Sequence, residues 1–187
     1  MDDKKYIIAI IVLATTALAC SIFIGGPAYP DSPIPISRSA TDDLQTYIQR
    51  AVAEGAKNGI ITLQITESEL TTYLKVRVES QNNPVITEPQ VILSDGQMKV
   101  YGKMQSSIFS ANVSITTRVS VNNGGQPQIE IIQTDLGPFP VPQRLNDAVT
   151  TFLDEAFTGS LGPIVTGFRL ESISITNGIM TVTGRVK

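Results

Sequence analysis

The feature that most constrains the fold is a long alternation of apolar and polar side chains over residues 109–121. Successive side chains of a β-strand point to opposite faces, so this pattern predicts one long strand with an apolar face and a polar face. Such strands are typical of antiparallel sheets that bury only one face. The apolar face consists of Phe109, Ala111, Val113, Ile115, Val119 and Val121.

Two dipeptides predict hairpins elsewhere in the chain. Asp95-Gly96 and Asn177-Gly178 are residue pairs that favour the two-residue turns of hairpins. Phe168 and Leu170 lie out of phase with Ile173, which predicts a β-bulge near Glu171-Ser172. The side chains expected to face each other are Val91 and Leu93 with Met98 and Val100, and Ile173 and Ile175 with Met180 and Val182.

Helical patterns flank these strands. Apolar residues recur at helical spacing from Thr41 to Ala56, and again from Leu145 to Ala156. Between them, Thr66 and Glu69 form a capping box that predicts the start of a second helix directly after a strand. We therefore expect an α+β fold in which a strongly twisted antiparallel sheet with one apolar face wraps on two or three amphipathic helices.

The N-terminus predicts a membrane segment before this domain. Residues 6–24 form 19 uncharged positions, which as a helix would be about 28 Å long and close to the thickness of a bilayer core. Lys4 and Lys5 place the N-terminus in the cytoplasm and the domain outside. The predicted division is 1–26 for a transmembrane anchor or signal segment, 27–40 for a Pro-rich linker, and 41–187 for an extracytoplasmic α+β domain.

Two other fates of this segment stay open. Ala17-Leu18-Ala19-Cys20 resembles a lipobox, in which Cys20 would be acylated and would anchor a lipoprotein. Ala17 and Ala19 also fit the small-residue pattern at which a signal peptide is removed. All three fates export the domain, so we expect it at the cell membrane, as a single-pass protein or as a lipoprotein. The linker, with prolines at 27, 30, 33 and 35, is expected to be a semi-rigid stalk.

The composition excludes the commonest kinds of active site. The chain has no histidine and a single cysteine, so Ser-His and Cys-His nucleophile pairs, zinc sites that contain histidine, and disulfides are all absent. A net charge of −3 without a basic block argues against nucleic-acid binding. We therefore expect a protein that is not an enzyme, with no catalytic residue, no metal ligand and no cofactor.

Three motifs carry a resemblance to a known group of proteins. These are TESELTTYL at 66–74, SDGQMKVYG at 94–102 and LGPFPVP at 136–142. With them the chain resembles the YpmS-like single-span exported bacterial proteins, and more distantly the LmeA-like envelope proteins and tubular lipid-binding (TULIP-type) domains. The resemblance implies a sheet wrapped around a helix, with an apolar groove that holds an acyl chain or another amphiphile.

The resulting hypothesis is a membrane-anchored extracytoplasmic module that binds lipid in an apolar groove. The candidate groove residues are Leu70, Tyr73, Leu74, Phe109, Val113, Phe139, Val149 and Phe152. The same residues also fit an ordinary closed core. The alternative function is a protein-interaction module or accessory subunit of an envelope complex, which would use an exposed edge of the strand from Ser110 to Ser120. The expected partners are thus the membrane, through residues 6–24, a lipid, and an envelope protein.

Overall fold

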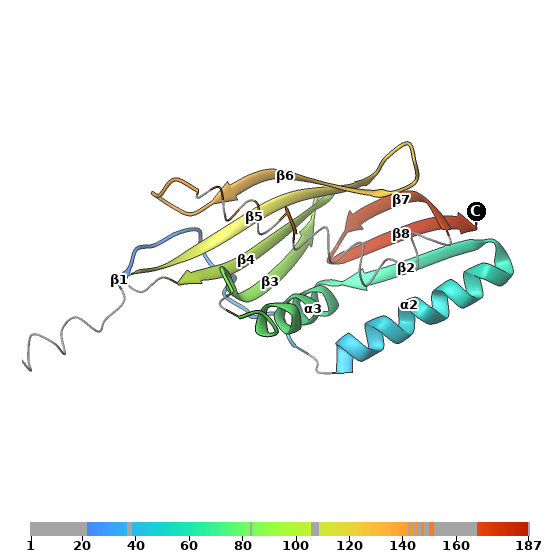
Figure 1. Ribbon diagram of the computed structural model, residues 1–187, viewed down its shortest axis with the longest axis horizontal. Coiled ribbons are helices and arrows are strands. Elements are labelled where there is room, and N and C mark those ends of the chain that lie inside the picture. The colour runs from blue at the N-terminus through green and yellow to red at the C-terminus, as the bar shows by residue number, and fades with distance from the viewer. Residues whose placement is uncertain are drawn as a thin grey trace, which may run out of the picture.

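The computed structural model describes residues 22–36, 39–82, 84–105, 109–141, 143, 145, 147, 150–151 and 168–186. Within this part of the chain, two β-sheets follow one another along the long axis, and two helices lie along one side (Figure 1). The chain is therefore built mainly from strands.

The larger sheet has five strands in the order β1-β5-β4-β3, with β6 also paired to β5. Its strands are β1 (Ile22–Phe23), β3 (Thr87–Ser94), β4 (Gln97–Gln105), β5 (Phe109–Val121) and β6 (Pro127–Asp135). The smaller sheet has the order β2-β8-β7, from β2 (Ile60–Thr66), β7 (Phe168–Thr176) and β8 (Ile179–Val186). The helices are α2 (Ser39–Asn58) and α3 (Glu67–Glu79). All strand pairs are antiparallel except β1 with β5, which is parallel.

The predicted fold class is wrong in two respects, of which the first is the number of sheets. The expected single sheet is divided into two, because β2 pairs along its whole length with β8 rather than with a strand of the larger sheet. Hairpin signals specify which strands are neighbours within a hairpin, but they do not specify which hairpins share a sheet. The pairing of Ile60 with Arg185 joins residues far apart in sequence, and no local pattern predicts it.

The second respect is the N-terminal membrane helix. Ile22 and Phe23 form β1, and the Ile24 N–H donates to the Ser110 carbonyl oxygen at 2.9 Å. The end of the predicted span 6–24 is therefore strand and extended chain that belongs to the larger sheet. Residues 1–21, including Cys20, lie outside the described residues. In the described ranges, no helix is both long and apolar enough to cross a membrane.

The Pro-rich segment is not the free stalk that we expected. Residues 24–36, which we call the N-terminal strap, run across the polar face of the larger sheet. The Gly25 carbonyl accepts from the Asn112 N–H at 2.9 Å, and the Pro27 carbonyl accepts from the Asn112 side chain at 3.2 Å. Farther along, the Ile34 N–H donates to Gln90 Oε1 at 2.7 Å. Proline cannot donate within a β-ladder, but its carbonyl still accepts, so side chains of the sheet hold the strap.

The opposite, apolar face of the larger sheet and the inner face of the smaller sheet form the core. The apolar face predicted for β5 is confirmed, because Ala111, Val113 and Ile115 are buried, but Ser114 of the predicted polar face is buried as well. In β2 the buried and exposed residues also alternate strictly. The largest fully buried side chains include Ile48, Ile61, Leu63, Ile65, Leu93, Ile115, Leu145 and Met180.

Both hairpins and the bulge are confirmed. Asp95 and Gly96 have φ angles of 52° and 74°, and Asn177 and Gly178 have 51° and 78°, as a turn with two left-handed residues requires. The register of β7 against β8 shifts between Leu170 and Ser172, which places the extra residue at the predicted bulge.

Helix α3 closes the free edge of β3. The capping box is confirmed, since the Thr66 N–H donates to Glu69 Oε2 at 2.7 Å and the Glu69 N–H donates to Thr66 Oγ1 at 3.3 Å. On the edge itself, the Val91 N–H donates to Thr71 Oγ1 at 2.9 Å and the Leu93 N–H to Glu67 Oε1 at 2.7 Å. These two donors are thus satisfied, which protects the edge from pairing with another chain.

The exposed edge predicted for the strand from Ser110 to Ser120 is wrong. That strand is β5, which lies inside the larger sheet between β4 on one side and β1 and β6 on the other. The serine and threonine side chains on one face of this strand indicated that the face is partly solvated. A solvated face does not imply a free edge, because the edge carries the backbone N–H and C=O groups that pair with neighbouring strands. Addition of a partner strand at β5 would first require the removal of β1 or β6.

Candidate functional site

Three phenylalanines lie at one end of the larger sheet, and we call them the aromatic end. Phe23 is 61% exposed and Phe139 is 44% exposed, whereas Phe109 is half-buried against the core. The rings of Phe109 and Phe139 stack with centroids 6.5 Å apart and an interplanar angle of 11°. Among the described residues there are four phenylalanines, and three of them lie at this end.

Strand register and one turn bring these residues together. Phe109 is the first residue of β5 and pairs with Ile22. Phe23 pairs with the next residue, Ser110, so its side chain lies at the same end of the sheet as Phe109 but on the opposite face. Phe139 arrives from the other direction, in the Pro-rich segment after β6. There the Gly137 N–H donates to Asp135 Oδ1 at 2.7 Å, and the positive φ of Gly137, 67°, lets the chain turn against Gly26 of the strap. A Cβ at residue 137 would collide with Gly26, so the turn requires glycine.

The aromatic end exposes two large apolar side chains, Phe23 and Phe139, to solvent. Single exposed apolar residues are normal, but a contiguous exposed patch usually marks an interaction with a ligand, a membrane or a protein. A phenylalanine ring that leaves water stabilises the bound state by about 1.5–3 kcal/mol when it is fully buried. The apolar N-terminal residues join the described chain at Ile22, directly next to these rings.

The eight predicted groove residues separate into three groups. Leu74 and Val113 are fully buried members of the core, while Leu70 and Tyr73 are partly buried on α3 and pack against it. The rings of Phe109 and Phe139 stack on each other at the aromatic end, so the structure brings these two predicted residues into contact. Val149 and Phe152 lie outside the described residues.

Two open clefts lie away from the predicted residues. The larger has a volume of about 840 Å³, and the β5–β6 turn and the strands β7 and β8 line it, with Arg169 and Arg185 among its residues. The second, of about 560 Å³, lies between the end of α3 and the start of β3, with Lys75, Glu79 and Glu88 in its wall. Both clefts contain charged side chains, and none of the predicted residues that the structure describes lines either of them, so neither is the groove that we expected.

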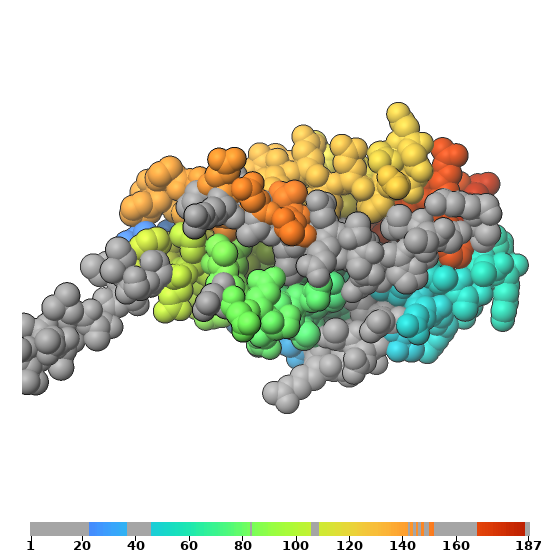
Figure 2. Space-filling view, in the orientation of Figure 1, coloured from blue at the N-terminus to red at the C-terminus, as the bar shows by residue number. Residues whose placement is uncertain are grey.

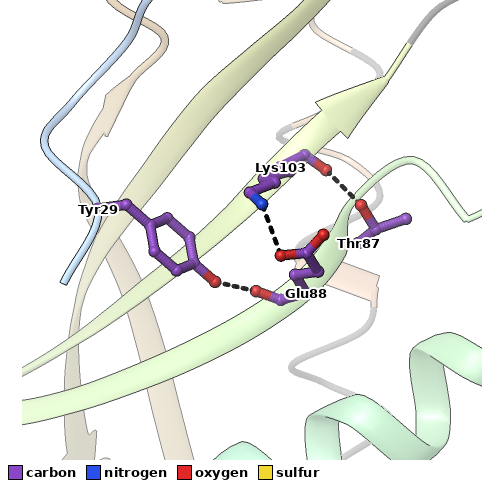
Figure 3. A network of polar contacts seen from close by, with 4 residues as sticks. All are labelled: Tyr29, Thr87, Glu88 and Lys103. Carbon is purple, nitrogen blue, oxygen red and sulfur yellow. Dashed lines mark hydrogen bonds and ion pairs between the residues drawn. The ribbon is translucent and has the colours of Figure 1, made fainter. Parts of the chain in front are cut away.

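A network of polar contacts fastens the strap where it crosses β3 and β4 (Figure 3). The Tyr29 hydroxyl donates to the Glu88 carbonyl oxygen, and Lys103 Nζ lies 2.6 Å from Glu88 Oε2. Thr87 Oγ1 donates to the Lys103 carbonyl oxygen at 3.1 Å. The Tyr29 ring also packs edge-on against Tyr101, with centroids 6.1 Å apart.

This network raises the pKa of Tyr29 and holds the N-terminal strap against β3 and β4. Burial, and secondly the negative charge of Glu88, raise the pKa of Tyr29 to about 12. A phenol with so high a pKa stays protonated at neutral pH, so it acts here as a hydrogen-bond donor. The sequence analysis missed this network, because Tyr29 and Glu88 are 59 positions apart and no motif joins them.

Comparisons with known proteins add little to this description. No family model matches the chain, and no curated protein is similar to it. Among solved structures, a crystal structure of lipopolysaccharide binding protein is similar over 81% of this chain and 48% of that chain, with 10% sequence identity and a TM-score of 0.24. A TM-score this low does not establish a shared fold. The likeness to YpmS-like proteins therefore remains a resemblance of sequence motifs.

Proposed function

We propose that this chain is a non-catalytic module that binds lipid or another amphiphile through its aromatic end, on the outer side of the cell membrane. The observation that carries the proposal is the stacked pair of Phe109 and Phe139, of which Phe139 is 44% exposed. Flat aromatic rings offer a large apolar surface to an acyl chain at a low entropic cost. In this proposal the acyl chain lies against Phe109 and Phe139, which are two of the eight groove residues.

The position of the aromatic end in the chain supports a lipid environment. Residues 6–21 are uncharged, and they lead directly into β1, whose Phe23 belongs to the aromatic end. If residues 6–21 direct the chain to the membrane, the phenylalanines of the aromatic end face the lipid surface, because the chain passes from these residues directly into that end. Cys20 lies two residues before β1, so acylation of Cys20 is an alternative attachment that would bring the same end to the bilayer.

The test uses a chain that begins at Ile22, so that the apolar N-terminal residues do not contribute to binding. Flotation with phosphatidylcholine and phosphatidylglycerol vesicles, and displacement of cis-parinaric acid, measure lipid binding. We expect Phe23→Ser and Phe139→Ser each to weaken binding by about 1–2 kcal/mol, or about five- to thirty-fold, because each removes a ring that lipid would cover.

The matched control is Ile60→Ser. Ile60 is 55% exposed and lies at the other end of the molecule, where it pairs with Arg185. This variant removes a similar exposed apolar side chain, so we expect lipid binding to stay at the level of the unaltered chain. The proposal fails if the chain binds neither vesicles nor fatty acid, or if Ile60→Ser weakens binding as much as Phe139→Ser.

A protein partner is the second candidate function. Leu74 and Val113, two of the predicted groove residues, are closed into the core, which favours a surface contact over an internal cavity. An exposed apolar patch rimmed by polar residues is also what a protein partner would cover. Loss of lipid binding in every assay, together with a cross-link from residue 139 to an envelope protein, would favour this second function.

A further inference from the structure

The larger cleft lies at the end of the molecule opposite the aromatic end. In Figures 1 and 2 the yellow β5–β6 turn reaches the red strands of the smaller sheet at this end. The Leu170 N–H donates to the Gly125 carbonyl at 3.1 Å, which joins the two sheets there. The cleft of about 840 Å³ is lined from the turn by Val121, Asn123 and Gly125, and from the smaller sheet by Arg169, Glu171 and Arg185.

Two arginines share one face of this cleft. Arg169 of β7 and Arg185 of β8 are direct partners in the antiparallel register, so their side chains leave the sheet on the same side. Like charges placed directly opposite each other destabilise a sheet. Glu171 compensates for only one of them, because its Oε1 lies 2.7 Å from Arg185 Nε. The three charges of the cleft thus sum to +1 in a chain whose net charge is −3.

The local backbone holds these side chains in place. The bulge after Leu170 inserts Glu171 as an additional residue, which lets its carboxylate reach Arg185 without displacing Ser172 from the ladder. On the other side, an Arg169 guanidinium N–H donates to the Asn123 carbonyl at 3.2 Å. Gly125 has a φ of 73°, and a Cβ at that position would collide with the Arg169 side chain, so glycine allows this close approach.

The remaining donors match the geometry of a phosphate. A guanidinium carries five N–H donors in a planar fork, and the contacts described above use one donor of each arginine. Two such forks side by side favour an oxyanion that accepts several bonds at once. Leu170 and Val121 give the same cleft an apolar component. We propose that this cleft binds a phosphate group, which Arg169 and Arg185 grip together.

The test measures the arginine Nε–Hε signals by NMR in the full chain, held in a nonionic detergent and titrated with inorganic phosphate at constant ionic strength. We expect the signals of Arg169 and Arg185 to shift with one common binding curve. Arg169→Gln and Arg185→Gln should each weaken the apparent affinity about tenfold, as the loss of a charge-assisted hydrogen bond implies. Added NaCl should also weaken it, because the cleft is open to solvent.

Arg118 is the internal control. It forms an exposed ion pair with Glu130 at 3.0 Å, similar to the pair of Arg185 with Glu171, but no second arginine faces it in the register. Its signal should not follow the phosphate curve, and Arg118→Gln should leave the affinity unchanged. Equal shifts at Arg118, or no shift at Arg169 and Arg185, would overturn the proposal.

A second arm separates the two sources of a phosphate group. Vesicles that contain phosphatidylglycerol offer the group as a lipid headgroup, and inorganic phosphate offers it free in solution. A response to both identifies a headgroup site, whereas a response to inorganic phosphate alone identifies a soluble phosphate compound. The result is independent of lipid binding at the aromatic end, because Phe139→Ser removes that contact without changing the cleft.

Discussion

Thr71 and Thr72 are neighbours on α3 with opposite roles, although both side chains are buried, with exposed fractions of 0% and 1%. Thr71 Oγ1 accepts the Val91 N–H, while Thr72 Oγ1 has no hydrogen-bond partner in the described part of the chain. We expect Thr71→Val to lower the free energy of unfolding by about 1–3 kcal/mol, because it leaves the Val91 amide buried and unpaired. Thr72→Val should be neutral or stabilising, because it removes an unsatisfied hydroxyl.

The two variants control each other. Valine is close to threonine in shape and in helix propensity, so the difference between them reports the hydrogen bond alone. Urea denaturation of both variants measures this difference. Equal destabilisation by the two substitutions would contradict the assigned contact between α3 and β3.

Tyr29 makes the attachment of the strap sensitive to high pH. Its pKa rises from 10.0 to about 12 in the folded chain, so folding favours the protonated phenol. The resulting stabilisation is fully present below pH 10 and is lost as the pH rises through 12. We expect phenolate absorbance to show a component near pH 12 that Tyr29→Phe abolishes.

Glu88→Gln separates the two causes of this shift. Burial is the larger cause, so the pKa of Tyr29 should fall in this variant but stay above 10.0. If the component near pH 12 remains in Tyr29→Phe, another tyrosine carries it and the network of Figure 3 is wrong.

At the scale of elements, the strap belongs to the folded body. Removal of residues 22–40 would leave Asn112 and Gln90 without the contacts that the strap provides. We expect the free energy of unfolding of a chain that begins at Thr41 to be lower by about 2 kcal/mol or more than that of a chain that begins at Ile22. Its Tm should fall by about 4–8 °C in a thermal denaturation experiment.

Two glycines of the strap give a finer version of the same test. Gly25 and Gly26 both have positive φ, but only at Gly26 would a Cβ collide with the Asn112 backbone. In the chain that begins at Ile22, Gly26→Ala should therefore lower Tm more than Gly25→Ala does. Equal Tm values for the long and short chains, or a larger effect at Gly25, would show that the strap does not pack as described.

The elements that could be predicted from sequence are those that local chemistry determines. The turn at Asp95-Gly96, the bulge near Glu171 and the capping box at Thr66 all depend on residues within a few positions of one another. The pairing of β2 with β8 and the docking of the strap depend on contacts between distant residues, and no short motif encodes them. Ile22 to Ile24 were assigned to a membrane helix because apolar β-branched and aromatic residues suit both a buried strand and a lipid-facing helix.

The candidate site also contains residues that could be predicted from the sequence and residues that could not. Phe109 and Phe139 were predicted as apolar residues of a groove, and the structure stacks them. Leu74 and Val113 were predicted for the same groove but lie in the closed core, since apolar periodicity identifies an inward face without showing what lies opposite. Arg169 and Arg185 were missed, because only the register of β7 against β8 brings them together.

At the scale of the whole molecule, the two ends differ in chemistry. The aromatic end presents exposed phenylalanines beside the chain that leads to the N-terminus, and the opposite end presents two arginines over an open cleft. The core between them is built from both sheets, and the β5–β6 hairpin spans its length (Figure 1). This separation predicts that contact with the acyl chains of lipid is confined to the aromatic end.

Tryptophan fluorescence measures that confinement most directly, because the chain has no tryptophan of its own. In a chain that begins at Ile22, Phe139→Trp places a single reporter at the aromatic end, and Ile60→Trp places one at the opposite end. With vesicles of brominated phosphatidylcholine, we predict a blue shift and strong quenching for Phe139→Trp, and neither change for Ile60→Trp. Quenching of both reporters to the same extent, or of neither, would contradict lipid binding at the aromatic end.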